Sequence, residues 1–124
     1  MELYKCTKCG AMTQTFKPCK CHDCGIKSTC CGQPMTKQIE NINDGAVEKH
    51  KPVVEICGNY IVVTVNHVME PDHFIEWIAY ESDSTFGKKQ LLPNQKAIAI
   101  FPYQKNSTVY AFCNKHGLWS TKIE

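Results

Sequence analysis

The stretch VYAFCNKHGLW, residues 109–119, places a thiol and an imidazole where one metal ion could bind both of them. Cys113 stands three residues before His116 and ends an alternating apolar run that predicts a β-strand. A soft thiolate and an imidazole at this spacing can reach the same ion from a single turn. The stretch therefore predicts a metal site at the end of a strand, and the remaining donors should indicate which metal it holds.

Four histidines lie outside the Cys-rich start of the chain: His50, His67, His73 and His116. Each is expected in a loop or at a strand edge, where a rigid β-framework can aim side chains at one point. Any one of them alone is equally well explained as a surface histidine. Four of them beside one cysteine favour a common site.

The number and type of these donors discriminate between metals. A structural zinc site is closed by four ligands, whereas this set offers five. A blue-copper site uses two His, one Cys and a weak axial Met, but no Met follows His116, and Met69 stands in a different segment. Iron accepts imidazole and thiolate together with five or six ligands, so a five-coordinate iron with one open position fits best.

Seven of the nine cysteines lie between residues 6 and 31, which indicates a separate N-terminal metal module. A C-x-x-C pair is followed by Gly10 and an adjacent Cys pair by Gly32, and glycine after a ligand lets backbone N–H groups face the sulfurs. On spacing alone, a zinc knuckle or ribbon and an iron centre are both open. The seven are Cys6, Cys9, Cys19, Cys21, Cys24, Cys30 and Cys31.

Composition narrows the class of protein. The formal net charge is +2 and all 14 basic residues are Lys. Because Arg is the usual bidentate reader of bases and phosphates, a specific nucleic-acid binder is not expected. No apolar run is long enough for a membrane helix, and the first residues lack the apolar core of a secretory signal. We therefore expect a cytoplasmic protein whose reduced thiolates bind metal rather than form disulfides.

Runs of β-branched and aromatic residues with period-two alternation predict five strands, at 53–56, 60–65, 74–81, 97–101 and 107–113. Cys57-Gly58-Asn59 predicts a hairpin between the first two. The polar segment 39–51, with Asp44-Gly45, is expected to be a connector and a functional loop. The pattern predicts a mainly β fold: an Ig-like antiparallel β-sandwich of about seven strands at 38–124, after a Cys-rich module at 1–37.

Together, EKHKPVVE, HVMEPDHFIEW and YAFCNKHGLW resemble the superoxide reductase family, which includes desulfoferrodoxin and neelaredoxin. The resemblance covers most of residues 47–119. It implies an enzyme, an oxidoreductase that reduces superoxide to hydrogen peroxide by one electron at a mononuclear non-haem iron. The ligands that it implies are His50, His67, His73 and His116 in the equatorial plane and Cys113 on the axis. It also implies that Glu48 closes the sixth position after oxidation and that Lys49 lies near the open site, where its charge would attract a small anion.

The N-terminal module departs from the usual family pattern. Cys6, Cys9, Cys30 and Cys31 match the single-iron module of desulfoferrodoxin, but the longer gap between the two pairs holds PCKCHDCG and three further cysteines. This arrangement resembles methanoferrodoxin, a relative with a [4Fe-4S] cluster. We therefore expect four of the seven cysteines to hold such a cluster, with a mononuclear Fe(Cys)4 centre as the alternative.

The resemblance also implies partners, and other functions stay open. A small rubredoxin- or ferredoxin-like protein is expected as electron donor, with the N-terminal centre relaying electrons, and a homodimer or homotetramer is expected. One alternative is an electron-transfer or iron-binding protein without turnover, in which the sixth iron position stays blocked. Another is a zinc-ribbon interaction module fused to a β-sandwich.

Overall fold

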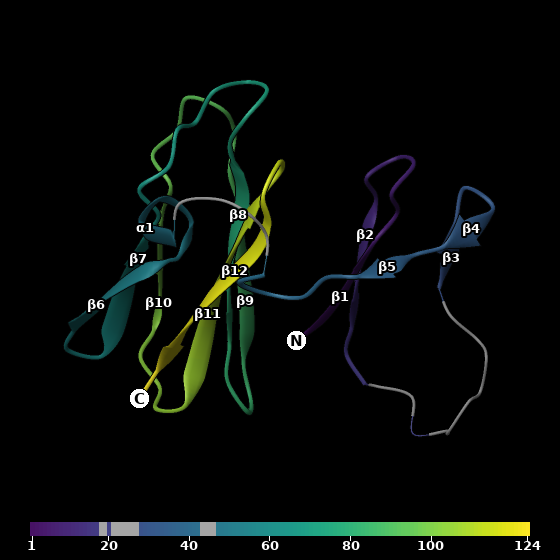
Figure 1. Cartoon of the computed structure of the whole chain (residues 1–124). Coiled ribbons are helices and arrows are strands. Elements are labelled where there is room, and N and C mark those ends of the chain that lie inside the picture. The colour runs from purple at the N-terminus through teal and green to yellow at the C-terminus, as the bar shows by residue number, and fades with distance from the viewer. Residues whose placement is uncertain (18–19, 21–27, 43–46) are drawn as a thin grey trace. The chain divides into compact units, whose positions relative to one another are not determined.

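The computed structural model describes residues 1–17, 20, 28–42 and 47–124 (Figure 1). The chain divides into two compact units, Met1–Ile39 and Glu40–Glu124. The assignment of separate functions to 1–37 and 38–124 stays a prediction.

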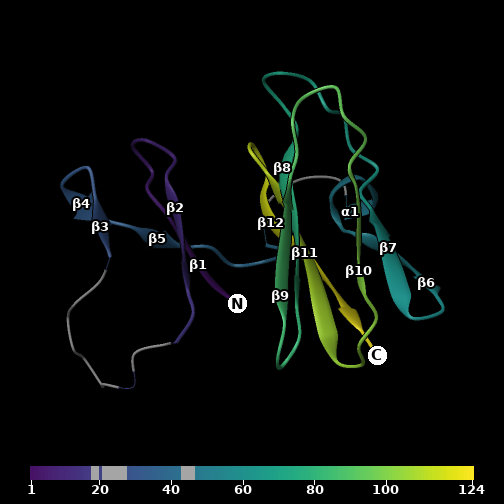
Figure 2. The same cartoon turned by 180° about the vertical axis from the view of Figure 1, so that it is seen from behind.

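The larger unit is a β-sandwich of two antiparallel sheets, with strand orders β10-β7-β6 and β12-β11-β8-β9 (Figures 1 and 2). The strands are β6 (Val53–Cys57), β7 (Tyr60–Thr64), β8 (Ile75–Glu81), β9 (Phe86–Gln90), β10 (Ile98–Pro102), β11 (Ser107–Cys113) and β12 (Gly117–Ile123). The predicted mainly β, Ig-like sandwich is confirmed, and so is the hairpin at residues 57–59, which joins β6 to β7.

Alternation along the strands determines which face of each sheet is buried. Ile61 and Val63 in β7 pair with Phe101 and Ala99 in β10, and all four lie in the core. Residues of β8 and β11 contribute to the same cluster from the facing sheet. Burying one Ile or Val side chain contributes about 1.5–3 kcal/mol relative to leaving it in water. The two sheets therefore form a stable frame from whose strand ends the site residues project.

In the larger unit, two strands and one short helix were not predicted. β9 is an edge strand, FGKKQ, whose side chains are mostly exposed, so it carries no alternating pattern. β12, GLWSTKI, mixes polar and apolar residues without regular alternation. The helix α1 (Val47–His50) is a single turn within the segment expected to be a connector, too short for a helical period. The expected turn at Asp44-Gly45 lies outside the described residues.

The smaller unit has its own short strands. β1 (Glu2–Lys5), β2 (Met12–Thr15) and β5 (Thr36–Lys37) form a sheet of order β2-β1-β5, while β3 (Thr29–Cys30) and β4 (Gln33–Pro34) form a hairpin. The two residues of that hairpin loop, Cys31 and Gly32, both have positive φ, 54° and 76°. Two positive φ values suit the tight loop of a twisted hairpin, and glycine at the second position lowers its cost.

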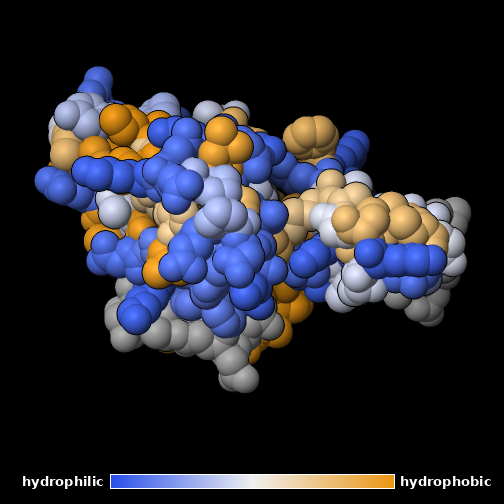
Figure 3. Space-filling view, turned by 90° about the horizontal axis from the view of Figure 1, so that it is seen from above, coloured by the Kyte–Doolittle hydropathy of each residue, from blue (hydrophilic) through white to orange (hydrophobic). Residues whose placement is uncertain are grey.

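Polar and apolar side chains are interspersed on the face shown in Figure 3. Exposed large apolar residues of the larger unit include Val53, Tyr60 and Ile100. Among the residues described, no helix has the length and apolar character needed to cross a membrane.

Candidate metal centres

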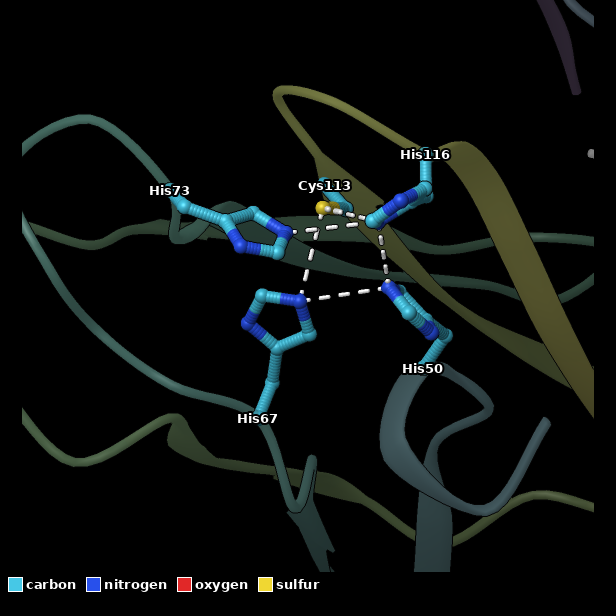
Figure 4. A group of neighbouring side chains, drawn as sticks. All are labelled: His50, His67, His73, Cys113 and His116. Atoms are coloured by element: carbon cyan, nitrogen blue, oxygen red, sulfur yellow. Dashed lines mark hydrogen bonds between the residues drawn. The ribbon is translucent and has the colours of Figure 1, made fainter. Parts of the chain in front are cut away.

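Five side chains that are distant in sequence converge in the larger unit (Figure 4). Each offers one donor atom, and all five donor atoms lie within 4.8 Å of one another. The set consists of His50 from α1, His67 and His73 from the connection between β7 and β8, Cys113 from the end of β11, and His116 from the turn before β12. The structure thus brings together the five residues that the sequence singled out as metal ligands.

The four imidazole rings form a closed cycle. His50 and His73 each contact both His67 and His116, with ring centroids 4.6–5.0 Å apart. His50 Nε2 lies 2.9 Å from His116 Nδ1 and 3.2 Å from His67 Nε2, and His73 Nε2 lies 3.3 Å from His116 Nδ1. A square with sides of this length has its centre about 2.2 Å from each corner, close to a metal–imidazole bond of ~2.0–2.1 Å. The nitrogens are therefore spaced as donors around one ion.

The Cys113 sulfur completes the donor set from the interior. Its Sγ lies 3.5 Å from His67 Nε2 and 3.7 Å from His116 Nδ1. Cys113 is fully buried and His50 is only 4% exposed, whereas His67, His73 and His116 are half-buried. Solvent therefore reaches the centre past the histidines, and the sulfur is on its closed side.

Trp119 braces two of the histidines. Its buried ring stacks on the His50 ring, with centroids 5.0 Å apart and an interplanar angle of 24°. Its indole Nε1–H donates a hydrogen bond of 3.1 Å to the His116 carbonyl oxygen. One core side chain thus orients α1 and the β11–β12 turn relative to each other, and through them two of the histidine donors.

Burial favours the neutral form of His67 and His73. His67 Nδ1 donates to the Val68 carbonyl oxygen at 2.5 Å, which leaves the lone pair on Nε2, the nitrogen that faces the other donors. Burial lowers the pKa of His67, and burial together with the positive charges of His116 and Lys115 lowers the pKa of His73. Neutral imidazole is the form that binds a metal, so these shifts favour binding near pH 7.

Two lysines flank the donor set. Lys49 is exposed and precedes His50 in α1, while Lys115 is exposed and precedes His116. The sequence reasoning singled out Lys49 but missed Lys115, although its place inside C-N-K-H was the available signal. The side chain of Glu48, the other predicted residue of this segment, lies outside the described residues.

The smaller unit gathers a second donor set, Cys6, Cys9, Cys30 and Cys31, whose sulfurs all lie within 4.8 Å of one another. Cys30 Sγ lies 3.6 Å from Cys9 Sγ and 3.9 Å from Cys31 Sγ. A tetrahedron with edges of this length has its centre about 2.3 Å from each corner, which equals a typical zinc–thiolate bond. The other three predicted ligands, Cys19, Cys21 and Cys24, lie outside the described residues.

The turn that carries the first cysteine pair directs N–H groups toward sulfur. The Gly10 N–H donates to the Cys6 carbonyl oxygen at 2.9 Å, and the Ala11 N–H lies 3.5 Å from Cys9 Sγ. The backbone N–H of Cys9 lowers the pKa of Cys6 to about 7, whereas hydrogen bonding with the Cys9 sulfur raises the pKa of Cys30 to about 12. One thiolate therefore forms easily, and a cation is needed for all four to ionise together.

Comparisons with known proteins identify the family. The sequence profile described as Desulfoferrodoxin matches residues 42–122. The chain is 37% identical to desulfoferrodoxin of Syntrophotalea carbinolica and 38% identical to that of Nitratidesulfovibrio vulgaris, in both cases over 98% of this chain, and over 96% and 95% of the relatives. The crystal structure of the superoxide reductase from Treponema pallidum superposes with a TM-score of 0.73 at 27% identity, covering 97% of this chain and 98% of that one. The chain belongs to the superoxide reductase family of desulfoferrodoxins.

Proposed function

We propose that this chain is a superoxide reductase that converts superoxide, with one electron and two protons, to hydrogen peroxide at an iron ion held by four histidines and one cysteine. The observation that supports this most directly is the convergence of His50, His67, His73, Cys113 and His116 in a chain of this family. Five donors with one soft thiolate suit iron better than a closed four-ligand zinc site. When bound, the iron supplies reversible one-electron chemistry.

The residues around the iron would have separate roles in the reaction. Cys113 is buried on the closed side, so its thiolate is kept from solvent and can supply electron density from a fixed direction. The half-buried histidines leave an approach for a small anion. Lys49 and Lys115 are exposed and directly precede the donors His50 and His116, so their positive charges would raise the local concentration of superoxide. Solvent water supplies the two protons. For Glu48 we propose the role that the resemblance implies, ligation in the oxidised state.

For the second centre, the sulfur spacing favours the mononuclear alternative over the predicted [4Fe-4S] cluster. Four sulfurs within 4.8 Å of one another suit a single tetrahedral ion, because a cubane binds each cysteine to a different iron and holds the sulfurs farther apart. We propose that Cys6, Cys9, Cys30 and Cys31 hold one iron that relays electrons from a rubredoxin- or ferredoxin-like donor. That donor, a homo-oligomeric state and a cytoplasmic location stay predictions.

The competing functions differ in measurable ways. In a carrier without turnover, the iron site would be blocked and reduced protein would not be oxidised by superoxide. A zinc-ribbon module would hold zinc at the four-cysteine site and lack visible absorption there. The test is to reduce the purified protein anaerobically, mix it with superoxide, and follow oxidation of the five-donor centre by absorption. We expect rapid second-order oxidation. A ferrous centre that stays reduced would exclude the reductase function, and metal and acid-labile sulfide analysis would separately settle the second centre.

A further inference from the structure

The pairing of β8 with β11 is irregular just before the sulfur ligand. Phe112 pairs with Trp77, but Cys113 pairs with Ile75, so the register shifts by one residue between them. Irregularities of this kind change the direction in which the next side chain points. After Cys113 the regular strand pairing ends, and hydrogen bonds of Asn114 join β11 to Phe74, the residue that precedes β8.

Asn114 makes three hydrogen bonds to the segment that carries His73. Its backbone N–H donates to the Phe74 carbonyl oxygen at 3.2 Å. Its side-chain Oδ1 accepts from the Phe74 N–H at 3.0 Å, and its Nδ2 donates to the Asp72 carbonyl oxygen at 2.9 Å. The side-chain amide therefore binds the residues on both sides of His73.

These contacts require an amide. The Phe74 N–H needs an acceptor and the Asp72 carbonyl needs a donor, and an Asn side chain of this length offers one of each. An Asp could accept but not donate, and an Ala could do neither. The His73 backbone is also tied to Glu70 by two hydrogen bonds of 3.0 and 3.1 Å, which close the turn on its other side. The His73 turn is thus attached as a unit to the β11–β12 turn.

We propose that Asn114 is a positioning residue of the five-donor centre. By holding the His73 segment against the turn that bears Cys113 and His116, it maintains the 3.3 Å separation of His73 Nε2 from His116 Nδ1. This inference rests on the proposed iron site and adds to it a residue whose side chain is not a ligand. Partners of this kind change metal affinity about 10–100-fold when they are removed.

The test compares metal release from full-length wild-type protein, Asn114→Ala and Asn114→Asp. Ferrous protein is challenged anaerobically with an iron chelator, and the release phase that is missing from a His116→Ala protein is assigned to the five-donor centre. We expect this phase to be about 10-fold faster in Asn114→Ala and faster than wild type in Asn114→Asp, which keeps only one of the two side-chain bonds, that to the Phe74 N–H. Release from the four-cysteine site should be unchanged, since that site is in the other unit.

A matched control uses Asn59, an exposed residue of the β6–β7 turn, changed to Ala and to Asp. The second readout is the thiolate-to-iron absorption of the oxidised protein, which should shift in both Asn114 variants and in neither Asn59 variant. A variant that merely unfolds more easily would show a lower melting temperature with the wild-type absorption and release rate. That result in Asn114→Asp, or in Asn114→Ala, would overturn the proposal. Absence of a five-donor release phase in the wild-type protein would instead refute the iron site itself.

Discussion

Replacing Trp119 by Phe should loosen the metal centre far more than its loss of packing alone would. The variant keeps an aromatic ring against His50 but loses the 3.1 Å hydrogen bond to the His116 carbonyl oxygen. Loss of one such bond costs about 0.5–1.5 kcal/mol. Because Trp119 itself is only 2% exposed, the smaller ring also leaves a cavity, and the two effects together lower the free energy of unfolding by roughly 2–3 kcal/mol.

For a unit of this size, that loss lowers the melting temperature of the metal-free protein by roughly 10–20 °C. Trp77→Phe is the matched control, because Trp77 is also buried but stacks on Phe112, with centroids 5.6 Å apart, instead of on a histidine. We expect both variants to melt earlier. Release of iron to a chelator should be about 10-fold faster in Trp119→Phe alone. Equal release rates in the two variants would refute the reasoning that Trp119 orients His50 and His116.

Three further predictions address the donors and their surroundings. Cys113→Ser should abolish the thiolate-to-iron absorption of the oxidised larger unit and most peroxide formation; a variant that keeps both would remove Cys113 from the ligand set. Lys49→Ala should keep its iron but react more slowly with superoxide, and its rate should depend less on salt, because charges separated by more than ~10 Å are screened at 0.1 M. Equal rates and equal salt dependences in the variant and the wild-type protein would show that Lys49 does not attract superoxide. Metal-free protein should lose stability to urea as pH falls below 6.5, since burial lowers the pKa of His67 and His73 and the unfolded chain therefore binds more protons there; a constant midpoint between pH 7 and pH 5 would contradict this.

The sequence anticipated the sandwich because most of its strands carry their own signal. β7 and β11 alternate or are rich in β-branched residues over their whole length, whereas the edge strand β9 packs few side chains and leaves no pattern to read. The five donors were recognisable because each lies in a short motif, such as C-N-K-H. That they form one site depends on three separate segments of the chain that only the folded sandwich brings together.

Other features depend on tertiary contacts that no local pattern contains. The stacking of Trp119 on His50 joins residues 69 positions apart, and the bonds of Asn114 to Asp72 and Phe74 span about 40 positions. Which of the seven N-terminal cysteines share a site could not be predicted either, because spacing alone does not say which sulfurs lie close together. Within the described residues, the two pairs at 6, 9 and 30, 31 meet because a short turn and a tight hairpin present them to each other.

The product stoichiometry of superoxide consumption tests the central claim most directly. Anaerobically reduced protein is mixed with a known amount of superoxide, less than the amount of the five-donor centre, and hydrogen peroxide and dioxygen are measured. A reductase forms one hydrogen peroxide for each superoxide and releases no dioxygen, and the five-donor centre is oxidised in equal amount. Formation of half as much peroxide together with dioxygen would show dismutation, and persistence of superoxide with the centre still reduced would show an iron protein without this activity; either result would contradict the assignment.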